Sequence, residues 1–362
     1  MEVKNLLFLL LLVLSNFMSY GQDTEVTYSP ATDFGIQGIA NEVSTYAYSR
    51  IDSTYSTHLS KRLQILSKNT AGLYVEFQTN SSFIDLKWEL GTYKVLPNMT
   101  PLAVNGFDLY GFKDSLWQYV DSGLAKGVKN EVRVIKNMDT SMTRFRLYFP
   151  LYGIVKTLHI GVDKNAEIKP TKVTDKPRVV IYGSSITQGA SASRPGMAYP
   201  SILGRWLKAE IFNFGFSGSG KMEPEMAAIL KNITADVIVL DCVPNPSPKQ
   251  ISERTIPFVE ILRETQPNVP ILMVESIFRE AGNWNQELGA RVRDQNSAFH
   301  ASYQELLEKG YTQLYYIPSD QLIGKDHEAT TDGVHFSDLG HYRMATTLKE
   351  QLSKLLDNSK KQ

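Results

Sequence analysis

Residues 179–189 read VVIYGSSITQG and decide how the second half of the chain folds. Four apolar residues, 179–182, lead directly into a glycine and two serines. A short apolar run that ends in a turn signal is typical of a strand buried on both faces, as in a parallel sheet. Ser184 and Ser185 would then follow the carboxyl end of this strand, the edge at which open parallel sheets bind ligands.

The same pattern, a short apolar run followed by a helical stretch, recurs to the end of the chain. Further apolar runs occupy residues 211–214, 237–240, 271–274 and 314–317. Helix-like stretches lie between and after these runs, at 198–209, 224–232, 251–266, 288–309 and 338–356. This alternation predicts a parallel sheet with helices on both faces, which is a three-layer α/β domain over residues 177–355.

The first half of the chain has a different pattern. Apolar residues alternate with other residues, as at Leu73, Val75 and Phe77, and turn-forming residues separate these runs. Such a period of two indicates antiparallel strands with one buried face, and therefore an all-β, jelly-roll-like sandwich over residues 30–168. Residues 169–176 contain proline, lysines and threonines and are predicted to form a short exposed linker.

The N-terminus has the features of a signal peptide. Lys4 precedes an apolar run at residues 6–14, and small residues near Gly21 provide a cleavage site, so residues 1–21 are expected to be removed. A membrane anchor is the alternative, but the run is far shorter than the ~20 residues that span a bilayer. We therefore expect a secreted or periplasmic protein without stable membrane insertion. The only cysteine, Cys242, cannot form an internal disulfide, which suits a periplasm or bacterial exterior.

The amino-acid composition of the chain argues against one class of binding partner, the nucleic acids. Hydrophobic residues make up 42% of the chain and charged residues 21%, which are ordinary values for a globular protein. Lysine plus arginine and aspartate plus glutamate number 38 each, so no net charge favours nucleic acid. We expect no nucleic-acid partner, and the sequence does not determine the oligomeric state.

A candidate catalytic base lies before the last helix-like stretch. Asp332-Gly333-Val334-His335 forms a D-x-x-H pattern, in which the carboxylate can reach the imidazole from the same turn. The aspartate would fix the tautomer of the histidine, and the histidine could then accept a proton from a serine nucleophile. A metal site built from His327, Asp332 and His335 is the alternative, although these residues lack a recognised metal-ligand spacing.

Two further strand ends carry groups that could stabilise an oxyanion. Residues 213–218, NFGFSG, contain small residues that expose backbone N–H groups, and Asn245 lies between two prolines after the next strand. Residues 215–221 also fit the start of a phosphate-loop pattern, but Met222 stands where that loop needs serine or threonine. Nucleotide binding is therefore disfavoured.

These four segments, taken in order, resemble the SGNH, or GDSL-like, hydrolase superfamily. GSSITQG corresponds to the family's G-D-S block, NFGFSG to N-x-G-x-S-G, PNP to G-x-N-D, and DGVH to the last block. The resemblance implies an SGNH-like α/β fold, no cofactor and no metal. It also implies Ser185 as nucleophile with Asp332 and His335, and an oxyanion hole formed by Ser185, Gly218 and Asn245.

The chain departs from the family pattern at two positions. Ser184 replaces the usual aspartate of the first block, and no aspartate follows Asn245. Because two serines are adjacent, Ser184 could also be argued as the nucleophile. Ser185 is preferred because it takes the serine position of the first block when Gly189 is aligned with the family's glycine.

A second resemblance lies in the β-rich half. Residues 106–110, GFDLY, resemble the G-x-D-L-Y motif of a β-domain that precedes SGNH domains in carbohydrate-active esterases. This implies a serine esterase that hydrolyses short-chain, especially acetyl, esters of a sugar or polysaccharide through an acyl-enzyme. The alternatives are a lipase or thioesterase of the same fold, and a carbohydrate-binding protein with a catalytically dead hydrolase domain.

Overall fold

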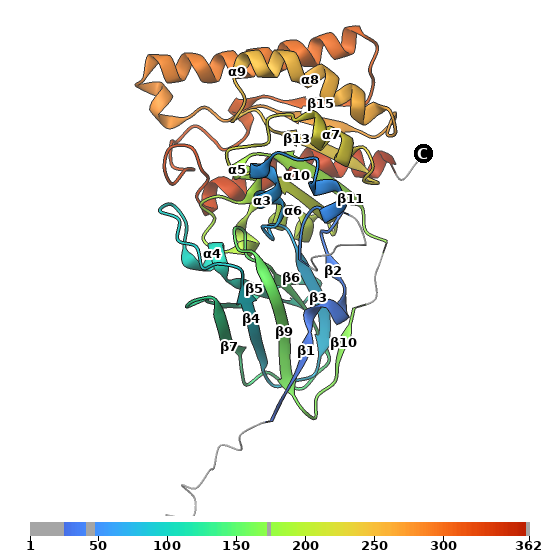
Figure 1. Cartoon of the computed structure of the whole chain (residues 1–362), viewed down its shortest axis with the longest axis vertical. Helices are drawn as coiled ribbons and strands as arrows, with labels where there is room; N and C mark the ends of the chain where they lie inside the picture. Colours follow the sequence, from blue (N-terminus) through green and yellow to red (C-terminus); the bar gives the residue numbers. More distant parts are fainter. Residues whose placement is uncertain (1–24, 41–47, 172–174, 360–362) are drawn as a thin grey trace, which may run out of the picture.

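The computed structural model describes residues 25–40, 48–171 and 175–359. The described chain forms two parts, a β-sandwich and a layered α/β domain, which are stacked along the long axis of the molecule (Figure 1). The predicted signal peptide, residues 1–21, lies outside the described residues. None of the described helices is both long and apolar enough to cross a bilayer.

The α/β domain is built on one five-stranded parallel sheet, as predicted. Its strand order is β12-β11-β13-β14-β15, with β11 paired to β12 and β13 along its length. The bounds of these strands are Arg178–Gly183 (β11), Glu210–Gly215 (β12), Val237–Asp241 (β13), Ile271–Val274 (β14) and Leu314–Ile317 (β15). Each apolar run identified in the sequence therefore forms most or all of one strand.

Helices cover both faces of this sheet, because both faces of its strands are apolar. Val179 and Ile181 of β11 pack into the core on one face, and Val180 and Tyr182 into the core on the other. The first face is covered by α6 (Tyr199–Trp206) and α10 (Asp338–Ser359). The second is covered by α7 (Pro224–Leu230), α8 (Pro248–Arg263) and α9 (Gln286–Glu308) (Figure 1). Short helical turns complete the domain, at α5 (Ser185–Gln188), η2 (Pro195–Met197), η3 (Glu280–Asn283) and η4 (Ser319–Gln321).

The N-terminal part is an antiparallel sandwich, also as predicted. One sheet has the order β1-β9-β4-β7, with bounds Val26–Pro30 (β1), Val155–Asp163 (β9), Ile84–Leu90 (β4) and Lys129–Ile135 (β7). The other has the order β10-β3-β8-β5-β6, with bounds Ile168–Pro170 (β10), Tyr74–Thr79 (β3), Thr143–Tyr148 (β8), Phe107–Lys113 (β5) and Leu116–Gly123 (β6). Short elements accompany the sheets, at η1 (Ala31–Phe34), β2 (Ile36–Gln37) and α4 (Pro101–Asn105). The predicted linker thus begins inside β10, which pairs with β3.

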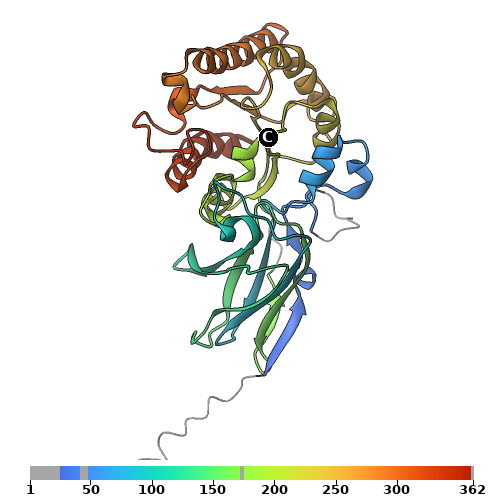
Figure 2. The same cartoon turned by 60° about the vertical axis from the view of Figure 1, so that its left-hand side comes forward.

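A segment of the N-terminal half packs on the α/β domain instead of the sandwich. It contains α2 (Ser53–Ser56) and α3 (Lys61–Ser67), which lie beside the α/β layers in both views (Figures 1 and 2). Ile51, Leu59 and Leu63 of this segment belong to the same apolar core as the sheet. Arg50 is fully buried there, and its Nη1 donates to the carbonyl oxygens of Asn213 (2.9 Å) and Gly215 (2.7 Å) at the end of β12.

The GFDLY segment, residues 106–110, forms a second contact between the two parts. Asp108 is completely buried, and its Oδ2 accepts from Arg194 Nη1 (2.9 Å) and from the Gly196 N–H (2.8 Å) in the loop before α6. Tyr110 Oη also accepts from Arg194 Nη1, at 2.5 Å. A Cβ at Gly196 would lie 2.5 Å from the Tyr110 ring, so only glycine fits. The motif therefore fixes the loop 194–196 of the α/β domain.

Replacing Asp108 is expected to destabilise the protein strongly. Asp108→Ala removes the charge partner of the largely buried Arg194 and leaves the Gly196 N–H without its acceptor, so we expect a loss of about 3–5 kcal/mol in the free energy of unfolding. Asp121→Ala on the adjacent strand is the matched control, because this aspartate is exposed, and should cost less than about 0.5 kcal/mol. Urea unfolding followed by circular dichroism measures both. Equal losses of unfolding free energy in the two variants would show that the contacts of Asp108 with Arg194 and Gly196 do not stabilise the fold.

Candidate active site

The first strand of the α/β domain delivers two serines to the carboxyl edge of the sheet. β11 ends at Gly183, and the chain turns at once into α5. A Cβ at Gly183 would lie 1.9 Å from Thr187 Oγ1, so this turn is only possible with glycine. Ser184 is the N-cap of α5 and Ser185 is its first residue. The sharp turn therefore places Ser185 at the edge where the predicted site should lie.

The structure brings Ser185, His335 and Asp332 together in a hydrogen-bonded line. Ser185 Oγ lies 2.9 Å from His335 Nε2, and His335 Nδ1 lies 2.8 Å from Asp332 Oδ2. Because the ionised carboxylate can only accept, Nδ1 carries a proton and Nε2 of the neutral ring is free to accept the serine proton. Asp332 Oδ1 also accepts from the His335 N–H, at 2.8 Å. This is the arrangement of an activated serine nucleophile.

The two adjacent serines differ in their surroundings. Ser184 is completely buried, and its Oγ accepts a hydrogen bond from the Ile186 N–H at 3.2 Å. Ser185 has 8% of its surface exposed, and its Oγ faces the histidine. Ser184 therefore caps a helix, and Ser185 is the serine whose hydroxyl is directed toward the histidine.

Asn98 joins this line from the N-terminal half of the chain. Its Nδ2 donates to Asp332 Oδ2 at 2.9 Å and lies 3.3 Å from His335 Nδ1. It belongs to the loop before α4, whose N-cap Thr100 donates through Oγ1 to the Ser193 carbonyl oxygen of the α/β domain. Asn98 was not predicted as a site residue, since no local pattern links it to Asp332, which lies 234 positions away.

These contacts keep Asp332 ionised. Partial burial alone would raise the pKa of Asp332, but hydrogen bonds from the His335 N–H, the His335 imidazole and Asn98 lower this pKa to about 2. The carboxylate therefore carries its charge at any pH near neutrality. It can hold the imidazole in the required tautomer and stabilise the imidazolium that forms when the serine is deprotonated.

The predicted oxyanion donors lie on the neighbouring loops. Neither the Ser185 N–H nor the Gly218 N–H donates to a backbone carbonyl oxygen of another element among the described residues. Gly218 has a positive φ of 69°, which turns the loop after β12. Asn245 Nδ2 donates one hydrogen to the Ser219 carbonyl oxygen at 2.6 Å, which ties the Asn245 side chain to this loop. The second hydrogen of this amide has no acceptor among the described residues.

A buried carboxylate lies behind the nucleophile and was not identified from the sequence as a site residue. Asp241 Oδ2 accepts from Thr187 Oγ1 and from Tyr199 Oη, each at 2.7 Å. Burial raises the pKa of Asp241 to about 6, although these two hydrogen bonds act in the opposite direction. Thr187 belongs to α5, so Asp241 anchors the helical turn that carries Ser185.

The geometry gives less support to the two alternatives, a metal site and a nucleotide-binding loop. His327 does not join Asp332 and His335, because its Nδ1 lies 2.7 Å from Glu280 Oε2 instead. Among the described residues, no group of three histidine, cysteine, aspartate or glutamate side chains is arranged to hold a metal ion. Met222, at the end of the phosphate-loop-like pattern, has a buried side chain.

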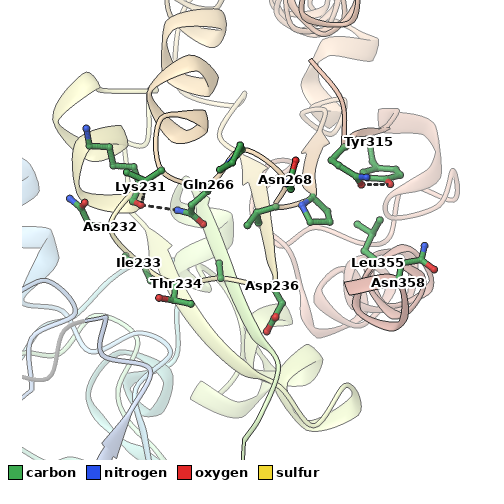
Figure 3. Close-up of a pocket in the computed structure, with 16 residues that line it drawn as sticks. Lys231, Asn232, Ile233, Thr234, Asp236, Gln266, Asn268, Tyr315, Leu355 and Asn358 are labelled. Atoms are coloured by element: carbon green, nitrogen blue, oxygen red, sulfur yellow. Dashed lines mark hydrogen bonds between the residues drawn. The ribbon is translucent and has the colours of Figure 1, made fainter. Parts of the chain in front are cut away.

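A cavity of about 430 Å³ lies at the opposite, amino end of the same sheet (Figure 3). It is formed by the loops that precede β13 and β14, together with the end of α10. Its polar lining includes Gln266, Asn268 and Tyr315. None of Ser185, Asp332 and His335 lines this cavity, so the cavity is separate from the candidate active site at the carboxyl edge.

Comparisons with known proteins agree with this assignment of the two parts. A model of the GDSL-like lipase/acylhydrolase family matches residues 176–353, and a model of the GxDLY N-terminus of SGNH-hydrolase-type esterases matches residues 26–168. A search of curated protein sequences found no match. Among solved structures, a GDSL-like lipase candidate from Bacteroides ovatus is 42% identical, with 92% of this chain and 98% of that chain covered and a TM-score of 0.89.

More distant structures share the fold. A salicylyl-acyltransferase from a tetracycline biosynthetic pathway is 17% identical, with 92% and 96% of the two chains covered and a TM-score of 0.72. A family two carbohydrate esterase from Clostridium thermocellum, solved with cellohexaose, is 13% identical, with 79% and 93% covered and a TM-score of 0.59. With matching models for both parts and a 42% identical relative over nearly its whole length, this chain belongs to the GDSL-like lipase/acylhydrolase family, in the branch that carries a GxDLY N-terminal domain.

Proposed function

We propose that this protein is a serine esterase that removes short acyl groups, especially acetyl, from a carbohydrate. The observation that carries the proposal is the continuous line from Ser185 Oγ through His335 to Asp332, with distances of 2.9 and 2.8 Å. A nucleophile, its base and the group that orients the base are thus in hydrogen-bond contact without a ligand to arrange them.

In the first half of the reaction, Ser185 Oγ attacks the ester carbonyl while its proton moves to His335 Nε2. The negative charge that develops on the carbonyl oxygen is stabilised by the N–H groups of Ser185 and Gly218 and by the amide of Asn245. The C–O bond to the sugar then breaks, and His335 returns its proton to the sugar oxygen. The products of this half are the free sugar hydroxyl and an acyl-serine.

In the second half, a water molecule replaces the sugar. His335 Nε2 accepts a proton from this water, whose oxygen attacks the acyl carbon. Collapse of the second tetrahedral intermediate breaks the bond to Ser185 Oγ, which takes the proton back from His335. Carboxylic acid leaves, and Asp332, whose pKa is about 2, remains ionised throughout.

The carbohydrate part of the proposal is supported by the two-domain resemblance. The esterase from Clostridium thermocellum that shares this fold was solved with a bound glucose oligomer. The N-terminal sequence pattern supports export to the periplasm or exterior, where polysaccharides are met, and we propose this localisation as well. A lipase or thioesterase would need an apolar groove beside Ser185. A carbohydrate-binding protein with a catalytically dead hydrolase domain would not need Ser185, His335 and Asp332 to be joined by hydrogen bonds.

The decisive experiment measures acetate release from a panel of acetylated polysaccharides, with p-nitrophenyl esters of increasing chain length alongside. We expect acetate release from at least one polysaccharide and a kcat/KM for the acetyl ester above that for the octanoyl ester. Equal or higher kcat/KM on octanoyl esters would favour a lipase. Absence of hydrolysis of every ester would favour the dead binding protein.

The two serines provide a matched pair of variants. Ser185→Ala should lower kcat by about 10⁴–10⁶, because the triad members act as a unit. Ser184→Ala should mainly lose a helix cap, which costs about 0.5–2 kcal/mol of stability and leaves most of the activity. Steady-state kinetics and a denaturation midpoint on the same preparations separate the two effects. An inactive Ser184→Ala protein beside an active Ser185→Ala protein would reverse the assignment.

Asn245→Ala should lower kcat by about 10²–10³ with little change in KM, because its amide hydrogen is used mainly in the transition state. The same change also removes the bond to the Ser219 carbonyl oxygen, so a small loss of stability is expected in addition. Kinetics and unfolding are therefore measured together. An unchanged kcat with a lowered unfolding midpoint would restrict Asn245 to a structural role.

Asn98→Ala should lower kcat by about 10-fold, the value of one hydrogen bond to a charged group, because Asp332, which orients His335, loses the hydrogen bond from Asn98. KM should change little, and Asp332 should remain ionised at pH 7 because the His335 hydrogen bonds to it persist. Val95→Ala is the control, since Val95 lies in the same loop and is 75% exposed. Similar kinetics for both variants would remove Asn98 from the site.

A further inference from the structure

Arg279 lies between two loops of the candidate active site. It follows β14 at the carboxyl edge of the sheet, on the strand next to the one that leads to Asn245. Its guanidinium Nη2 donates to the Pro244 carbonyl oxygen at 2.7 Å, directly before Asn245. The next N–H along the chain, that of Glu280, donates to the Gly333 carbonyl oxygen at 2.9 Å, directly after Asp332. Residues 279–280 therefore contact both the loop that carries Asn245 and the loop that carries Asp332.

The charge of Arg279 has no counter-ion among the described residues. Among the described residues, no carboxylate forms an ion pair with its guanidinium, and the bond to Pro244 is its only side-chain hydrogen bond. Its Nε is buried and has no acceptor there. The nearest carboxylate in sequence, that of Glu280, is already engaged with His327 at 2.7 Å.

Four other arginines that are largely buried, Arg50, Arg146, Arg194 and Arg263, make two to four side-chain hydrogen bonds each, against one for Arg279, although Nε of Arg263 also has no acceptor among the described residues. Arg146 and Arg194 pair with the carboxylates of Glu76 and Asp108. Arg263 donates to four backbone carbonyl oxygens. Because a buried charge without a partner is costly, such charges in proteins are usually paired with an opposite charge or hydrogen-bonded. Arg279 lacks one at the place where a substrate would bind.

A second arginine, Arg291, adds to the positive charge near Arg279. Arg291 lies on α9, one helical turn before Gln295, whose Nε2 donates to the Pro246 carbonyl oxygen at 2.6 Å. Arg291 is exposed and has no ion pair among the described residues. Burial, and then the neighbouring charge of Arg291, lower the pKa of Arg279. Two guanidinium groups therefore flank the Asn245 loop, although the whole chain has no net charge.

We propose that Arg279, with Arg291 beside it, binds the carboxylate of an acidic sugar, so that the preferred substrates are O-acetylated, uronate-containing polysaccharides. This inference rests on the proposed function and names its substrate class. The planar guanidinium offers donors in the geometry that a carboxylate accepts, and a charge-assisted bond in a partly desolvated site is strong. A uronate unit next to the acetylated sugar supplies the missing counter-ion.

The test compares substrates that differ only in this charge. O-acetylated oligogalacturonides are used with free carboxylates and with the carboxylates converted to amides, and acetylated xylo-oligosaccharides are used with and without glucuronate side groups. For the full-length protein we expect kcat/KM for acetate release to be about 10- to 100-fold higher on the charged member of at least one pair. This preference should shrink as salt is raised, because screening weakens the ion pair.

Variants assign the preference to one side chain. Arg279→Gln should reduce the ratio of kcat/KM between charged and neutral substrates by about 10-fold or more, and Arg279→Lys should keep part of it because the charge remains. Arg293→Gln is the control, since Arg293 is an exposed arginine two residues along the same helix from Arg291. It should change the ratio by less than about 2-fold. A denaturation midpoint for each variant shows that it is folded.

The outcomes separate this inference from the proposed function. If the protein cleaves p-nitrophenyl acetate and neutral acetylated oligosaccharides but shows no preference within either pair, the acidic-sugar inference is wrong and the esterase proposal stands. The inference is also overturned if Arg279→Gln and Arg293→Gln change the ratio equally. If no ester of any kind is hydrolysed, the proposed function itself fails.

Discussion

The active-site edge depends on backbone segments that approach each other more closely than a side chain would allow. A Cβ at Gly220 would lie 2.1 Å from the Gly183 carbonyl oxygen, and a Cβ at Gly215 would lie 2.1 Å from the Gln188 nitrogen. These glycines let the loop after β12 rest directly on the end of β11 and on α5. The loop that carries Gly218 is thereby held against the turn that carries Ser185, and donors fixed before the reaction are what the proposed oxyanion hole needs.

Much of the architecture was predictable because its signals are local. Four of the five strands of the parallel sheet contain four consecutive apolar residues, and β12 has three apolar residues interrupted by Asn213. Turn-forming residues follow three of the five strands with the candidate site groups. The D-x-x-H pattern is also local, since Asp332 binds both the backbone and the ring of a residue three positions away. Ser185 could be named because a strand end fixes where the next residues lie, and the remaining choice against Ser184 came from a family alignment.

The features that the sequence did not reveal depend on how the two halves dock. Asn98 has no pattern that connects it to Asp332, and it reaches the triad only because the sandwich packs against the α/β domain. Asp241 was visible as the last residue of a strand, but its role follows from Thr187 and Tyr199, which reach it from other elements. The packing of residues 51–66 on the α/β core was likewise hidden, because their apolar residues would suit either core.

The contacts of buried Arg50 constrain the order in which the two halves of the chain can fold. The carbonyl oxygens that it binds belong to residues 163 and 165 positions further along the chain, so they do not exist when Arg50 leaves the ribosome. The sandwich can close early, but the segment with Ile51, Leu59 and Leu63 must stay exposed until β12 has formed. The two halves are thus separate in architecture yet cannot mature as independent modules, and a cut between them would leave an unfilled groove on one piece and an uncovered apolar strip on the other.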